Sequence, residues 1–573
     1  MRVNIVSNYQ PTTGLMQDVG ILRGILSGVF EKDVQLNRVH YMQPQCAEAE
    51  VNIFLEVINP SLFSYARKNI WIPNVEWTYR TWLPYLHMVN EIWVKTREAE
   101  AIFGSLTPTK VRYIGWTSID KVMPEKKNYY KAIVPVGKNI YRAPKALFQA
   151  YMRLKQVKPS VYSSLPHLNV VCSPEHINVQ IPLAIEDKVT LHHNLKEHQY
   201  DELLQECGVC ICTSLAEGFG HAVNEAMSSG CNLILSSIAP FQQDLVGEVQ
   251  NGVFYAAKSD QIDQPNCFGR LVDTDVGSLM DALEEYTDTT FKERKLGSET
   301  IRKVYEVRHK LWIDRMKELL PQIVHPEPYS LTASMPKEED LPDVSIVMLT
   351  RDRRNFMPVA KYSYMIQSYP EDKLELVVVD DGDDPIEDDL IGVPNVKYVR
   401  LEEKKSIGEK RNIGVQNAMY DIIAFMDDDD VYPNNSITHR VAMLLKTPAK
   451  ECAFCTTIPC YDITRYSSFM NVPPMTLEMS ERVSEATLIF TRKFWEEKKF
   501  EDVQVAEGNT FIRGREHMCR ELSPQDVIVS LTHPKNTSHR KIPEFKEPNG
   551  CHYGFNENLY AMVSQIGEEM KNV

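Results

Sequence analysis

The chain has 573 residues, which is too many for one hydrophobic core and predicts three or four lobes. Its composition, 43% hydrophobic and 25% charged, is that of an ordinary folded protein and excludes disorder over most of its length. The net charge of −15 disfavours a protein that coats nucleic acid, so we expect no nucleic-acid partner, although nucleotide binding stays open.

The N-terminus, MRVNIVSNY, has a short apolar stretch followed by polar residues, and it predicts no signal peptide. A run of about 18 apolar residues, the minimum for a membrane helix, is absent from the sequence. We therefore expect a cytoplasmic protein without a transmembrane segment. Twelve cysteines, with clusters at 207–212 and 452–460, predict reduced buried thiols rather than zinc sites, because no paired histidines accompany them.

Strand and helix signals alternate in the first 320 residues. Apolar runs at 3–7, 131–136, 208–213 and 232–236 predict strands, and the pattern at 278–320 predicts helix. This alternation predicts two Rossmann-like lobes, residues 1–122 and 123–320, that meet at a cleft.

The predicted strand at 208–213 is followed by a glycine-containing loop and a helix that starts near His221. The loop has the sequence Glu217-Gly218-Phe219-Gly220, and Glu225 lies further along the helix. The helix N-terminus and the glycine amides predict an anion site suited to a diphosphate. The alternative is a plain crossover in which the glycines only reverse the chain.

This string resembles the donor-site signature of family 4 GT-B glycosyltransferases, which retain anomeric configuration. The resemblance implies that Glu225 binds the nucleotide ribose, that Glu217 faces the donor sugar, and that no metal is needed. Lys138 and Arg142 follow the strand at 131–136, where the family has its two basic diphosphate ligands, with lysine and arginine exchanged. Residues 12–14 stand where an acceptor-side loop is expected, although the first lobe otherwise departs from the family pattern.

Residues 321–342 contain five prolines among polar residues and predict a stiff linker. The remaining residues, 343–573, have strand signals at 344–350, 374–381, 396–401 and 421–427, with helical patterns at 356–368 and 408–419. Such alternation predicts a third domain with a mostly parallel, doubly wound sheet.

The run at 421–427 ends in four carboxylates, Asp427 to Asp430. Because side chains alternate along a strand, Asp427 and Asp429 are expected on one side and Asp428 and Asp430 on the other. Converging carboxylates predict a Mg²⁺ or Mn²⁺ site that completes its shell with substrate phosphates. A solvated acidic turn is the alternative.

Polar residues follow the other predicted strand ends of this domain as well. They are expected to bind a nucleotide sugar, and they are Thr350, Arg351, Asp352, Asp380, Asp381, Lys410, Arg411 and Asn412. With Asp427 to Asp430 they make the segment at about 343–540 resemble a GT-A glycosyltransferase of family 2 type.

That resemblance implies an inverting, metal-dependent transfer. It makes Asp427 a ribose and metal contact, Asp429 a direct ligand of Mn²⁺ or Mg²⁺, and Asp428 part of the donor site. A carboxylate must also take the proton of the acceptor hydroxyl. Glu507, which precedes a helical stretch, is favoured over Asp502 for this role, and His533 is a candidate third metal ligand.

The sequence therefore predicts a bifunctional glycosyltransferase, two Rossmann-like lobes of GT-B type followed by a GT-A domain. It would use nucleotide-sugar donors, expected to be UDP-sugars, and extend a glycan or glycoconjugate. Two alternatives stay open. The N-terminal half could be a non-catalytic binding module, or the acidic strand could serve a sugar nucleotidyltransferase. The sequence indicates no oligomeric state.

Overall fold

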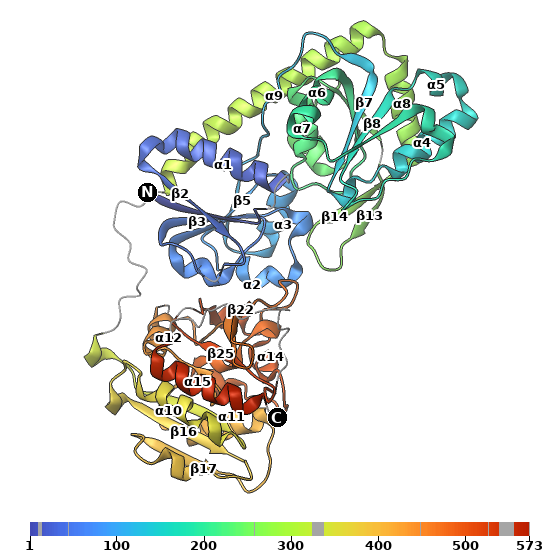
Figure 1. The fold of residues 1–573 in the computed structure, drawn as a ribbon. Coiled ribbons are helices and arrows are strands. Elements are labelled where there is room, and N and C mark those ends of the chain that lie inside the picture. Colours follow the sequence, from blue (N-terminus) through green and yellow to red (C-terminus); the bar gives the residue numbers. More distant parts are fainter. Residues whose placement is uncertain are drawn as a thin grey trace. The chain divides into compact units, whose positions relative to one another are not determined.

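The computed structural model describes residues 1–9, 14–43, 45–86, 88–256, 258–323, 337–446, 449–524, 526–537 and 555–571. The chain forms two compact units (Figure 1). The first comprises Met1–Tyr41, Ala49–Ile58 and Lys68–Glu327, and the second comprises Met42–Glu48, Asn59–Arg67 and Pro328–Val573. Most of the predicted linker, 324–336, lies outside the described residues.

The first unit begins with a sheet in the order β2-β1-β3-β4-β5-β6. Its strands are β1 (Arg2–Ser7), β2 (Gln35–His40), β3 (Ala49–Leu55), β4 (Ala66–Ile72), β5 (Glu91–Val94) and β6 (Lys110–Tyr113). The accompanying α-helices are α1 (Gly14–Phe30), α2 (Leu83–Leu86) and α3 (Arg97–Leu106).

A second parallel sheet of this unit has the order β12-β11-β10-β7-β8-β9. Its strands are β7 (Asn128–Gly137), β8 (His167–Cys172), β9 (Val189–His193), β10 (Cys207–Cys212), β11 (Asn232–Ser236) and β12 (Val253–Ala256), and β13 (Lys258–Asp263) pairs with β14 (Arg270–Thr274) beside it. The helices are α4 (Lys145–Val157), α5 (Pro159–Ser164), α6 (Glu197–Glu206), α7 (His221–Ser228), α8 (Val276–Asp288) and α9 (Phe291–Leu319). The chain builds outward from β7 to β9 and then returns to the other side of β7 with β10, so the carboxyl ends of β7 and β10 form a topological switch point, where open α/β sheets bind ligands.

Helix α9 joins the two lobes of the first unit. It packs on α7 and also on α1, and Figure 1 shows it running from one lobe to the other. Trp312 of α9 packs edge-on against Trp116, with ring centroids 5.5 Å apart. One hydrophobic cluster therefore includes residues from both lobes, from Val3 to Ile323.

The second unit contains a mixed sheet in the order β17-β16-β15-β18-β23-β20-β24 and a smaller sheet in the order β19-β25-β21-β22. The strands are β15 (Val344–Thr350), β16 (Leu374–Asp380), β17 (Val396–Arg400), β18 (Ile422–Phe425), β19 (Asp430–Val431), β20 (Cys452–Phe454), β21 (Ile458–Asp462), β22 (Ser467–Asn471), β23 (Ile489–Thr491), β24 (Cys519–Glu521) and β25 (Val529–Thr532). The helices are α10 (Met357–Met365), α11 (Ile407–Asn417), α12 (Ser436–Leu445), α13 (Arg492–Glu497), α14 (Glu507–Ile512) and α15 (Glu557–Met570).

The central strands β15 and β16 are buried at every residue, because helices cover both faces of a parallel sheet. Helix α11 begins with a capping box between Ser406 and Glu409. It approaches β15 closely at Gly414, where an added Cβ would lie 2.3 Å from a methyl of Val347. The order β17-β16-β15-β18 puts a second switch point between the carboxyl ends of β15 and β18.

The predicted fold class is confirmed, since two Rossmann-like sheets precede a GT-A-like doubly wound sheet. The two predicted cysteine clusters consist of buried free thiols. None of the helices in the described ranges has both the length and the apolar character needed to cross a membrane.

Candidate active site

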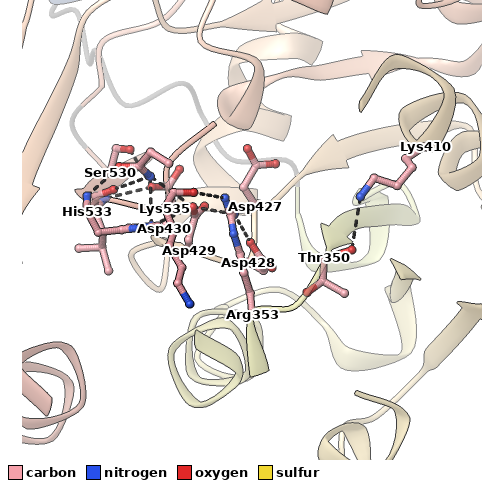
Figure 2. Close-up of polar contacts among 12 residues, drawn as sticks. Thr350, Arg353, Lys410, Asp427, Asp428, Asp429, Asp430, Ser530, His533 and Lys535 are labelled. Carbon is pink, nitrogen blue, oxygen red and sulfur yellow. Dashed lines mark hydrogen bonds and ion pairs between the residues drawn. The ribbon is translucent and has the colours of Figure 1, made fainter. Parts of the chain in front are cut away.

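The four aspartates lie at the switch point of the second unit, but they do not extend strand β18. The strand ends at Phe425, and Asp427 to Asp429 belong to a loop and turn before β19. The expected alternation of the carboxylates is therefore wrong. Figure 2 shows Asp428 and Asp429, predicted to face opposite ways, both in contact with Arg353.

Arg353 is the cation nearest to this acidic turn among the contacts described. Its Nη1 lies 2.8 Å from Asp428 Oδ1 and 2.7 Å from Asp429 Oδ2, and its Nη2 donates to the Lys535 carbonyl. Burial raises the pKa of Asp428 to about 6, with Arg353 opposing that rise and Asp429 adding to it. Burial would lower the pKa of Arg353, but Asp428 and Asp429 raise it overall. The second carboxylate oxygen of Asp428, Oδ2, is buried without a described partner.

His533 joins the same cluster from the end of β25. Its Nε2 lies 3.1 Å from Asp429 Oδ2, and the Asn536 amide donates to that oxygen at 3.3 Å. Asp430 instead accepts from the Ser530 hydroxyl and the Leu531 amide, which ties β19 to β25. The Asp430 side chain therefore has partners on β25, whereas Asp429 contacts the buried His533 side chain.

The donor set suits a hard divalent cation. Carboxylates and an imidazole are ligands that Mn²⁺ accepts, and Asp428 Oδ2, in this buried acidic cluster, makes no hydrogen bond within the described ranges. Among the described residues, no group of three or more histidine, cysteine or acidic side chains has the geometry of a metal site. Arg353 supplies the positive charge in this arrangement.

The polar residues at the carboxyl ends of β15 and β16 differ in whether they line the cavity. Thr350, Arg351 and Asp352 line the cavity. Asp380 does not, and it accepts from the Gly382 amide at 2.8 Å and the Tyr398 hydroxyl at 2.7 Å. Its role in the described contacts is to shape the turn after β16.

Lys410 and Arg411, neighbours on α11, take different partners. Lys410 Nζ lies 2.7 Å from Asp381 and 3.3 Å from the Thr350 carbonyl, as Figure 2 shows for the latter. Arg411 Nη1 donates to Asp427 at 3.0 Å and its Nε donates to Glu507 at 3.1 Å. Arg411 thus connects the acidic turn with helix α14.

Asn412 and Asp502 lie outside the group that lines the cavity. The Asn412 side chain accepts from Trp495 Nε1 at 2.9 Å and donates to the Phe500 carbonyl at 2.8 Å, which fastens the segment before α14. Asp502 is exposed, whereas Glu507 is buried and lines the cavity. Of the two base candidates, Glu507 is the one beside Arg411.

These groups surround a cavity of about 510 Å³. It is lined by residues that sequence reasoning assigned and by others that it did not, and the charged and amide side chains of the second group include Arg353, Glu485, Lys535 and Asn536. Arg353 adjoins the predicted cluster at 350–352 and could have been found from that position. Glu485 lies in a stretch without a motif, so the sequence gives no signal for it.

The first unit has its own cluster at the switch point between β7 and β10. Arg142 donates to both carboxylate oxygens of Glu217, at 2.5 and 2.7 Å. Lys138 lies half-buried directly after β7. Burial would lower the pKa of Arg142, but Glu217 raises it overall. Arg142, predicted to bind a diphosphate, is thus paired with the glutamate predicted to face the sugar.

The glycine loop before α7 is held by close contacts. Gly220 has φ +99°, a conformation that glycine adopts easily, and an added Cβ would lie 2.8 Å from Phe241. At Gly218 an added Cβ would lie 2.6 Å from the Asn74 side chain. Phe219 is buried and packs edge-on against His221. Asn74 therefore covers the loop from the first lobe.

Glu225 lies on the face of α7 that meets α1. It accepts from Gln17 at 2.5 Å, and burial raises its pKa. Next to it, His221 contacts Asp18 at 2.8 Å, and Asp18 pairs with Lys95 at 2.5 Å. The predicted acceptor-side residues Thr12 and Thr13 lie outside the described residues, and Gly14 begins α1.

Each unit of the chain contains a segment that matches a known protein family. Residues 345–497 match the family model "Glycosyl transferase family 2", and residues 182–264 match "Glycosyl transferases group 1". A GDP-mannose:cellobiosyl-diphosphopolyprenol alpha-mannosyltransferase of Xanthomonas oryzae pv. oryzae is 31% identical over 126 residues, which are 22% of this chain and 30% of that protein. The match thus spans less than a third of that relative.

Among solved structures, the chain is similar to a mannosyltransferase from Pyrobaculum calidifontis in complex with GDP-Man and Mn²⁺. The identity is 17% over 36% of this chain and 60% of that one, with a TM-score of 0.28. It is also similar to sucrose-phosphate synthase from Thermosynechococcus elongatus, at 10% identity over 56% of this chain and 99% of that one, with a TM-score of 0.41.

The two family matches are both to glycosyltransferase models, and they agree with the fold and with the acidic switch point. A segment that matches the group 1 model precedes a segment that matches the family 2 model, in the order that the sequence predicted.

Proposed function

We propose that the second unit transfers a sugar from a nucleoside diphosphate donor to a hydroxyl of a glycan or glycoconjugate, with inversion and with a divalent metal. The observation that supports this most is the cavity of about 510 Å³ between β15 and β18, which is lined by Asp427 to Asp430. Its volume falls in the range of about 300–1,000 Å³ typical of small-ligand sites.

Asp427, Asp429 and His533 are the residues that would hold Mn²⁺ or Mg²⁺. When bound there, the ion would neutralise the diphosphate and favour its departure. Arg353 pairs with both Asp428 and Asp429 in the buried turn and so offsets their mutual repulsion. Thr350 and Arg351 also line the cavity, and we propose that they contact the nucleoside.

We expect the donor nucleotide to be UDP. GDP is the second candidate for the chain as a whole, because the Xanthomonas relative is named for GDP-mannose. The acidic turn itself would contact the diphosphate rather than the base, so it does not discriminate between the two.

For the first unit we propose a retaining, metal-independent transfer at the switch point between β7 and β10. Glu217 would face the donor sugar, Glu225 the ribose, and Lys138 and Arg142 the diphosphate, with Gly218 to Gly220 allowing close approach of the backbone. A donor would then replace Glu217 as the partner of Arg142.

A second candidate for this unit is a non-catalytic binding module. Two contacts favour it, the bidentate Arg142–Glu217 pair and the Asn74 side chain packed on Gly218, because both fill space that a donor would need. If both units are catalytic, the fusion favours sequential additions, since a tethered second site raises the effective concentration of the intermediate.

The test is a donor screen on the full chain, with release of nucleoside diphosphate as the readout. Asp429→Asn and Glu217→Gln are assayed singly and together, with and without EDTA. We expect Asp429→Asn and EDTA to abolish the same activity, and Glu217→Gln to abolish a second, EDTA-resistant one. A wild type that shows only EDTA-sensitive activity, with Glu217→Gln equal to it, would favour the non-catalytic module, and release of pyrophosphate would favour a nucleotidyltransferase.

A further inference from the structure

Helix α14 begins at Glu507, and the next residue, Gly508, has no side chain. The carboxylate of Glu485 occupies the space beside it. The Gly508 amide donates to Glu485 Oε1 at 3.2 Å, and an added Cβ at Gly508 would lie 2.9 Å from that oxygen and from Glu485 Cγ. A carboxylate from a distant loop thus lies where a side chain at 508 would otherwise project.

Glu485 and Glu507 both line the donor cavity, but their partners differ. Glu507 accepts from Arg411 Nε at 3.1 Å, and the same guanidinium is bonded to Asp427. The described hydrogen bond to the Glu485 carboxylate comes from the neutral Gly508 amide. A carboxylate paired with arginine is a weaker proton acceptor than one paired with an amide.

The charged groups that face Glu485 are Glu507 on α14 and Arg411 on α11. Burial raises the pKa of Glu485 to about 8, Glu507 adds to the rise, and Arg411 opposes it. A general base works best when its pKa lies near the working pH, because it must be deprotonated yet still attract a proton. Glu485 meets that condition in the cavity wall.

We propose that Glu485 is the catalytic base of the second unit and that Glu507 is a positioning residue that orients Arg411. This inference rests on the proposed glycosyl transfer. The acceptor hydroxyl gives its proton to the Glu485 carboxylate while its oxygen bonds to the anomeric carbon of the donor. The bond from that carbon to the diphosphate breaks, and its electron pair leaves with the nucleoside diphosphate.

The experiment measures donor turnover from pH 6 to 9 in the full chain with Mn²⁺. In the wild type, kcat/KM should rise with pH and level off above about 8, because only the deprotonated carboxylate accepts a proton. Glu485→Gln should lower kcat by about 100-fold or more and remove this rise, with donor KM little changed. Glu507→Gln should lower activity but keep the rise.

Two further variants separate the proposed role from a structural one. Glu485→Asp, which keeps an ionisable group, should retain the pH-dependent rise with kcat lowered by about tenfold. Glu516→Gln is the matched control, since Glu516 is a half-buried glutamate outside the cavity lining that also accepts from a glycine amide, that of Gly514 at 2.9 Å, and it should behave as the wild type.

The outcomes separate the proposed role of Glu485 from the proposed function of the second unit. An active wild type, with Glu485→Gln within threefold of it and an unchanged pH profile, overturns the role of Glu485 alone. Loss of the rise in Glu507→Gln but not in Glu485→Gln assigns the base to Glu507 and also overturns it. A wild type that turns over no nucleotide sugar overturns the proposed function and this inference together.

Discussion

Replacement of Arg353 by methionine tests the electrostatics of the acidic turn. The guanidinium contacts Asp428 at 2.8 Å and Asp429 at 2.7 Å, and the side chains of these aspartates are only 1% and 9% exposed. Methionine keeps much of the length of the side chain but removes the charge. Two buried carboxylates would then lie together without their counter-ion.

The size of the effect follows from this burial. At 2.8 Å and an effective dielectric constant of about 20, one such pair is worth about 6 kcal/mol before desolvation is subtracted. Removing one partner of a buried pair typically costs about 3–5 kcal/mol, because the remaining charge stays buried. We therefore expect Arg353→Met to lower the free energy of unfolding of the second unit by about 3–5 kcal/mol.

The assay is hydrogen exchange of peptides from β15 and β16 at increasing urea, because these strands report the second unit by themselves. EDTA is present so that no metal replaces the lost charge. The matched control is Arg354→Met, since Arg354 is the next residue and pairs with Asp384 and Asp388 at the surface. The control should stay close to the wild type, because exposed pairs are screened by water. Equal losses in the two variants would refute this reasoning.

Two further predictions concern close contacts of glycine. Gly408 lies in the first turn of α11, and an added Cβ there would lie 1.8 Å from the carbonyl oxygen of Glu501. Gly408→Ala should therefore destabilise the second unit by about 1–3 kcal/mol and lower its metal-dependent turnover. Gly24→Ala on α1 of the first unit, with no atom within 4 Å of the added Cβ, should be neutral or stabilising in the same urea titration followed on peptides from β1 and β3. Gly218→Ala should displace Asn74 and change only the EDTA-resistant turnover, so a loss of the metal-dependent turnover in this variant would contradict the separation of the two sites.

Much of this fold can be predicted from the sequence. Strand β15 has the predicted bounds, Val344–Thr350, and β16 ends one residue before its predicted end. Both strands are continuous apolar runs. Helices cover both faces of a parallel sheet, so such a run is buried whichever face each side chain points to. The acidic turn could be found for the same reason, since it follows a third run of this kind.

The details of the site depend on contacts between distant segments, which local patterns do not encode. Strand β18 stops at Phe425 because the chain turns there, so the period-two rule does not apply to Asp427 and Asp429. Glu485 lines the cavity and accepts from the Gly508 amide, a contact between segments 23 residues apart. The roles of these residues, including the choice between Glu507 and Asp502, stay predictions.

The central claim is that the acidic turn of the second unit holds a divalent metal together with a nucleotide. Its most direct test measures Mn²⁺ binding to the full chain in the presence of UDP or GDP, with the electron paramagnetic resonance signal of the free ion as the readout. The account predicts that the wild type binds Mn²⁺ together with one of these nucleotides, and that Asp429→Asn loses this binding while Asp384→Asn keeps it. Binding that is absent from the wild type, or that survives in Asp429→Asn, would contradict the account.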